Sequence, residues 1–332
     1  MTAKLGEGHF GFGVGELWAW SAALSFAAVD VMLRAAAPQV DPWLASLLTL
    51  LPLAAVAWFR LAHGSFGALR PGHSEYLGAR LIGALLLGGA IGYVVGNFFF
   101  FTALADGGLA ISVNALQGGN VWGGAILGAL ILRERPRTEQ LVGGLIIVAG
   151  LTIIAVSRLD TPGDMWFAGL LMAVAAGICY ASTNVATRLV QRRRAALAAV
   201  LACTAAGGLV PLSILLAFRA VAEPTTLFDG LQGRDVVVVL GSGVVSILAM
   251  VSVGQAVRHV SVATVNAIGS SAVVFTLLAS IVLFNEAAPA LMFVGVAGVL
   301  VGILVGQAKG RTMVPAGEEP ASVLGGVVDL DG

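Results

Sequence analysis

One acidic residue lies well inside an apolar segment that is long enough to cross a membrane. Asp30 falls within the segment 16–36, and Arg34 follows it four residues later. A charge near the centre of a bilayer costs roughly 2.5–3.5 kcal/mol on insertion scales, so this carboxylate needs a function or a partner. Two interpretations are open. Asp30 carries a coupling proton, or Arg34, on the same helical face, neutralises it as a structural pair.

Uncharged hydrogen-bonding side chains within other apolar segments form a second set of candidates. Neutral polar groups of this kind suit zwitterions, sugars and drugs alike, because they offer both donors and acceptors. Their positions predict one polar cluster towards each mouth of a shared cavity. The candidate solute-binding residues are Asn97, Asn114, Gln117, Asn120, Asn184, Asn266, Ser270 and Ser271, together with Tyr93 and Tyr180, which either wall the cavity and stack on an apolar or aromatic solute or pack in the core or against lipid.

Small residues interrupt two of the apolar segments at corresponding positions. Gln117-Gly118-Gly119-Asn120 lies near the middle of one segment, and Gly269-Ser270-Ser271 lies in the other. Such interruptions in both halves of a duplicated chain are the best sequence indication of a transporter site. Close packing of helices through small residues is the alternative, and the two interpretations are compatible.

Other glycines recur at every fourth position and favour helix packing alone. One series runs through Gly88, Gly92 and Gly96, and a second contains Gly298, Gly302 and Gly306. Small residues at this spacing allow two helix backbones to approach closely. A homodimer through the second series is a further expectation.

The segments that carry these residues belong to an internal duplication. The stretch 111–136 aligns without gaps on the stretch 263–288. Val113 falls on Val265 and Glu134 on Glu286, at one constant offset. Two copies of one helical unit predict a site between them, near the middle of the membrane. Glu134 and Glu286 end equivalent helices, where a structural role at the helix end is favoured over a gate.

Apolar windows of about 20 residues, the length that crosses a hydrocarbon core, indicate about ten helices, five in each copy. Helices are expected because lipid offers no hydrogen-bond partner to the backbone, and the windows are too long for barrel strands. The windows are Glu16–Ala36, Pro42–Leu61, Ala79–Ala103, Leu109–Leu132, Thr138–Val156, Met165–Val190, Ala195–Val221, Asp235–Val257, Val262–Phe284 and Pro289–Gln307.

Basic residues orient these spans, because cytoplasmic loops carry an excess of Lys and Arg. With the N-terminus inside, the external side receives only Arg34, Arg158, Arg219 and Arg234. Both termini are then cytoplasmic, and an odd number of spans per copy makes the repeat inverted. The expected divisions are a cytoplasmic lead at 1–15, the first five-helix repeat at 16–157, a linker at 158–164, the second five-helix repeat at 165–307 and a disordered cytoplasmic tail at 308–332.

Composition excludes several functional classes. Hydrophobic residues make up 58% of the chain and charged residues 11%, so most of the surface must face lipid. The net charge of zero argues against a nucleic-acid partner. The four histidines fall in the lead or in loops, no phosphate-binding loop is visible, and no nucleophile has a base beside it within the membrane. We therefore expect no enzyme activity, no cofactor and no metal site.

The duplicated unit resembles the EamA family of the drug/metabolite transporter superfamily. The resemblance lies in Ala103-Leu104 and Ala256-Val257, the helix ends LRERP at 132–136 and LFNEA at 283–287, and the Gly-rich helices that follow them. It covers nearly the whole chain except its ends. It implies an inner-membrane carrier, since members are mostly exporters of amino acids and other small metabolites, some of them driven by protons.

The sequence therefore predicts a secondary active transporter, a permease for efflux of amino acids or related solutes by alternating access. A passive facilitator or channel without ion coupling is the first alternative. A non-transporting membrane partner or lipid-handling protein, with Arg192–Arg194 binding anionic headgroups, is the second.

Overall fold

The computed structural model describes residues 13–64, 66–73, 76–133, 138–157, 165–191, 196–222, 231–259, 268–269 and 271–307. Within these ranges the chain forms helices joined by turns and contains no strand. Six helical stretches in this part of the chain are long and apolar enough to cross a membrane, and three shorter apolar helices accompany them. The predicted lead and tail lie almost wholly outside the described residues.

The helices follow the predicted windows closely. Those of the first half are α1 (Val14–Ala36), α2 (Pro42–Gly64), the short η1 (Phe66–Leu69), α3 (Ala79–Gly89), the π-helical turn η2 (Ala90–Gly96), α4 (Asn97–Leu132) and α5 (Thr138–Val156). Those of the second half are α6 (Trp166–Gln191), α7 (Leu197–Ala222), α9 (Gly233–His259), α11 (Ala272–Phe284) and α12 (Ala290–Gln307). The beginning of the predicted helix at 262–284 lies outside the described residues.

The long stretch α4 folds back on itself at Gly108. This glycine has φ 76° and ψ 172°, a conformation outside the helical region that L side chains rarely adopt. The hydroxyl of Ser112 donates to the carbonyl of Ala103 at 2.7 Å. In a continuous helix these two residues would be roughly 13 Å apart along the axis. The parts before and after Gly108 therefore form a tight hairpin, in agreement with the two separate windows predicted there.

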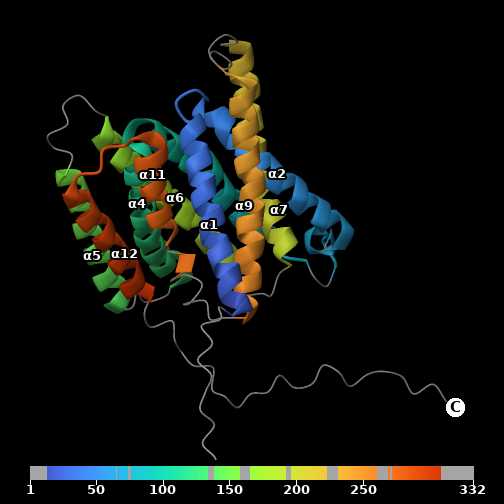
Figure 1. Ribbon diagram of the computed structural model, residues 1–332. Coiled ribbons are helices and arrows are strands. Elements are labelled where there is room, and N and C mark those ends of the chain that lie inside the picture. Colours follow the sequence, from blue (N-terminus) through green and yellow to red (C-terminus); the bar gives the residue numbers. More distant parts are fainter. Residues whose placement is uncertain are drawn as a thin grey trace, which may run out of the picture.

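Helices α5 and α12 pack against each other in a reciprocal manner that reflects the duplication (Figure 1). A Cβ added to Gly143 would lie 2.4 Å from the carbonyl oxygen of Gly302, and one added to Gly150 would lie 2.7 Å from that of Gly295. Gly143 and Gly295 are equivalent in the two copies, as are Gly150 and Gly302. Each copy thus presents the same surface to the other, as antiparallel helices related by a two-fold axis must do.

The other contacts between the two copies also occur in equivalent pairs. Helix α1 packs along α9, and its counterpart α6 packs along α3 and η2. Helix α2 contacts α9, while its counterpart α7 contacts α3. Figure 1 shows α1 and α9 lying side by side along most of their length. The packing therefore maps onto itself when the two copies are interchanged.

Both glycine series serve close packing within the chain. Cβ atoms added to Gly88 and Gly92 would lie 2.8 Å from Ala186 Cβ and 2.0 Å from Thr183 Oγ1, both on α6. In the second series, Gly302 faces Gly143 of α5. The homodimer predicted through Gly298, Gly302 and Gly306 stays a prediction, although these glycines already lie against Gly143 and Gly150 of α5.

Candidate functional site

A buried junction at Glu286 joins the two copies. The chain leaves α11 through Asn285, whose φ of 50° is left-handed, and Glu286 follows at once. Glu286 Oε1 accepts from the backbone N–H of Leu109 at 2.8 Å, and Oε2 accepts from that of Ala110 at 3.3 Å. The carboxylate therefore caps the helical segment that begins after Gly108, where a negative charge is stabilised by unpaired N–H groups.

Arg34 completes this junction. Its Nε lies 3.0 Å from Glu286 Oε1, and its guanidinium stacks over the ring of Phe284 at 5.6 Å. The two charged side chains are only 18% and 11% exposed. A Cβ at Gly108 would lie 2.6 Å from Glu286 Oε1, so the turn has to be glycine for the carboxylate to fit. The spacing of the sequence pairs Arg34 with Asp30, whereas the structure pairs it with Glu286.

Asp30 is half-buried on the face of α1 that meets α11. Ala23 and Ala27, seven and three residues earlier, cluster with Ala272 of α11. Arg34, four residues later, reaches Glu286 just beyond that helix. Residues three and four apart share one face of a helix, so Asp30 lies on the same stripe. Within the described residues no hydrogen bond or ion pair engages its carboxylate.

Asn97 and Tyr180 form a polar pair between the first part of α4 and α6. The Tyr180 hydroxyl donates to Asn97 Oδ1 at 2.5 Å, and Asn97 is only 8% exposed. Tyr180 also stands edge-on to Phe100, with ring centroids 6.4 Å apart. The structure thus brings two of the predicted site residues, Asn97 and Tyr180, into contact.

Asn114 lies in the second part of α4 and is completely buried. Its Nδ2 donates to the carbonyl of Ala110 at 2.7 Å, one turn earlier. Its Oδ1 is buried and has no hydrogen-bond partner among the described residues. An unsatisfied buried acceptor costs about 1–3 kcal/mol, so its presence needs an explanation.

The interruption at 117–120 serves close helix packing, and its part in solute binding stays a prediction. Gly118 and Gly119 are packing positions, because Cβ atoms there would lie 2.8 Å from Ile147 Cγ2 and 2.2 Å from the carbonyl oxygen of Val174. Asn120 Oδ1 accepts from Nδ2 of Asn184 on α6 at 3.2 Å. Gln117 is partly exposed, so its amide is accessible.

The remaining predicted residues are more scattered. Tyr93 packs against the backbone of α7, since a Cβ added to Gly208 would lie 2.6 Å from the Cβ of Tyr93. The hydroxyl of Ser271 donates to the carbonyl of Ile268 at 2.6 Å, within its own helix turn. Asn266 and Ser270 lie outside the described residues.

Comparison with known proteins decides the family. The family model described as "EamA-like transporter family" matches residues 13–156 and 167–305, which is most of the chain. The chain belongs to the EamA-like transporter family. It is also similar to a protein known from a crystal structure, with 21% identity and a TM-score of 0.58 over 90% of this chain and 97% of that chain. At that identity the likeness shows the fold alone. No curated protein matches the chain.

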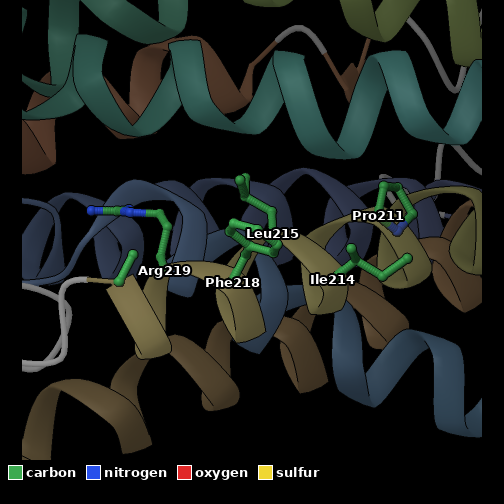
Figure 2. A pocket seen from close by; sticks show the side chains of 6 residues that line it. Pro211, Ile214, Leu215, Phe218 and Arg219 are labelled. Carbon is green, nitrogen blue, oxygen red and sulfur yellow. The ribbon is translucent and has the colours of Figure 1, made fainter.

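In this EamA-like chain, an open depression along α7 is separate from the site residues. Its volume is about 400 Å³, and Figure 2 shows its labelled side chains all coming from that one helix. Phe218 and Ile214 are 78% and 63% exposed, as expected of side chains that face lipid. Arg219, at one end, donates from Nη1 to Asp41 Oδ2 at 2.8 Å. We interpret this depression as part of the membrane-facing surface of a multi-pass membrane protein.

The sequence did not reveal the partners of Glu286. It placed this residue correctly at a helix end but could not show that the carboxylate caps a different helix in the other copy. The available signal was Gly107-Gly108, a glycine pair that interrupts the long apolar stretch before Leu109. Glu134, the equivalent residue of the first copy, lies outside the described residues.

Proposed function

We propose that this EamA-like chain is a secondary active transporter, a permease that moves small metabolites across the inner membrane by alternating access. Its ten helices form two five-helix repeats that enter the membrane in opposite senses, with both termini in the cytoplasm. The reciprocal packing of Gly143 with Gly302 and of Gly150 with Gly295 supports this proposal most strongly. Inverted repeats that enclose one site can open it to either side by rocking against each other.

Amino acids or related compounds, moved outwards, are the leading solutes by resemblance to the family. Purified protein reconstituted into proteoliposomes should release preloaded, labelled solute faster than protein-free vesicles. A panel of amino-acid analogues and toxic metabolites, tested for export-dependent resistance in expressing cells, selects the solute. Absence of flux for the whole panel in both assays would reject the transport function and favour a non-transporting membrane partner.

Asp30 is the proposed proton-coupling residue. Because Arg34 binds Glu286, the Asp30 carboxylate has no fixed counter-charge on its own helix and is able to exchange a proton. This observation favours coupled transport over a passive facilitator.

We predict that Asp30→Asn reduces proton-driven accumulation in everted vesicles by about tenfold or more, because the amide cannot carry the proton. Downhill flux of the same solute should fall much less. Asp106→Asn is the matched control, since Asp106 is a partly exposed carboxylate two residues before the turn at Gly108. Unchanged coupling in Asp30→Asn would favour the facilitator.

A further inference from the structure

Asp30 and Asn114 lie at the same depth below the Glu286 junction. Helix α1 reaches that junction at Arg34, and the second part of α4 leaves it at Leu109. Asp30 precedes Arg34 by four residues, about 6 Å along the axis, and Asn114 follows Leu109 by five, about 7.5 Å. The contacts of Glu286 thus fix the two polar residues at one level.

Both residues also face the same helix, α11. Helices α1, α4 and α11 pack against one another in all three pairings. Asp30 lies on the stripe of α1 that contacts α11, as described above. Asn114 lies one turn after Ala110, which shares a core cluster with Val273 and Leu277 of α11. The two side chains therefore border one three-helix junction.

At the level of Asp30 and Asn114, the unengaged groups of the described residues are both hydrogen-bond acceptors, and the accessible amide of Gln117 lies about one turn further along α4. The two acceptors are the carboxylate of Asp30 and Oδ1 of Asn114, the second of which is fully buried. The Tyr180 hydroxyl of α6 is already directed to Asn97. A ligand that satisfies these acceptors has to bring N–H or O–H groups. A positive charge on the ligand would compensate the negative charge of Asp30.

A carboxylate has no comparable partner here. The sequence contains no Lys, Arg or His in the stretches 14–33, 81–132, 166–187, 235–257 or 261–307. Arg34 is the closest basic residue, and Glu286 holds it. An anionic group would therefore lie beside Asp30 without a counter-charge, which is costly in a low-dielectric environment.

We infer that Asp30 and Asn114 form a subsite for an ammonium group, so that amines without a carboxylate are preferred over amino acids, and amino acids over carboxylic acids. The inference rests on the proposed transport function and narrows its solute class. Asp30 supplies the charge and Asn114 Oδ1 accepts one N–H of the ammonium group. The subsite requires no change in the Arg34–Glu286 pair.

Three ligands with the same phenyl group test this preference: phenethylamine, phenylalanine and 3-phenylpropionate. Each is titrated against the full chain, purified in detergent, while the thermal unfolding midpoint is recorded. We expect phenethylamine to raise the midpoint at concentrations about tenfold lower than phenylalanine, and 3-phenylpropionate to have no effect. Equal or tighter binding of 3-phenylpropionate overturns the inference, and so does binding of none of the three.

Asn114→Leu separates ligand recognition from folding. Removing an unsatisfied buried acceptor should leave the ligand-free midpoint unchanged or raise it, while phenethylamine affinity falls about five- to tenfold. Thr152→Val is the matched control, because Thr152 is exposed on α5 and bonds only to Val148 within its helix. Unaltered amine affinity in Asn114→Leu contradicts the subsite. Amine binding without flux in proteoliposomes would instead refute transport and leave the subsite intact.

Discussion

Gly177→Val is expected to prevent α4 and α6 from packing and to remove most of the folded protein. A Cβ at this position would lie 2.1 Å from the carbonyl oxygen of Leu116 and 2.6 Å from the backbone N of Asn120. Because both of these are backbone atoms, no side-chain rotation can relieve the clash, and the helices must separate. Gly119 makes the reciprocal approach, since its Cβ would lie 2.2 Å from the carbonyl oxygen of Val174.

The expected loss exceeds the usual cost of overpacking, which is about 1–3 kcal/mol. The measurement is the monodisperse fraction on size exclusion together with the thermal midpoint. We expect the midpoint to fall by about 5 °C or more in any protein that remains folded. Gly124→Val is the matched control, because an added Cβ there has nothing within 4 Å. Similar behaviour of the two variants would contradict this helix crossing.

The duplication made much of the fold predictable from the sequence. One offset aligned Gly143 with Gly295 and Gly150 with Gly302, and these are the residues at which α5 and α12 approach each other. The same offset relates Arg133 to Asn285, and both adopt the left-handed conformation at a helix end, with φ of 55° and 50°. Repeated sequence led to repeated local structure because equivalent positions meet equivalent neighbours in each copy.

The site was less predictable, because its contacts join helices that are distant in the sequence. Local spacing indicated a pair between Asp30 and Arg34, but an i, i+4 pair is worth only about 0.2–0.5 kcal/mol. The junction offers Arg34 a buried carboxylate that is itself oriented by two backbone N–H groups. Spacing along one helix carries no information on a partner 252 residues away.

The π-helical turn Ala90–Gly96 also escaped prediction. One extra residue in a helical turn shifts the following side chains around the axis, and a window of apolar residues does not record such a shift. The turn comes directly before Asn97, whose side chain it helps to direct towards Tyr180. Such turns are rare and often occur near functional sites.

Arg34→Met should destabilise the protein far more than Arg234→Met, although both arginines form ion pairs near the ends of their helices. Arg34 is 18% exposed and contacts Glu286 at 3.0 Å, whereas Arg234 is 77% exposed and lies 3.6 Å from Asp235. Removing one partner of a buried pair leaves the other charge uncompensated and costs about 3–5 kcal/mol. Asp235 is only 4% exposed, but it also accepts from the backbone N–H of Gln232 at 3.3 Å, and its pair with the solvated Arg234 should contribute only about 0–1 kcal/mol.

The double variant Arg34→Met, Glu286→Gln distinguishes the ion pair from the helix cap. Glutamine retains one side-chain oxygen for the N–H of Leu109 but carries no charge. If the pair dominates, Glu286→Gln alone destabilises strongly, and adding Arg34→Met restores part of the thermal midpoint, since no charge is then left unpaired. If the cap dominates, the two effects add and only Glu286→Ala is severe. Equal midpoints for Arg34→Met and Arg234→Met would show that the junction does not hold the two copies together.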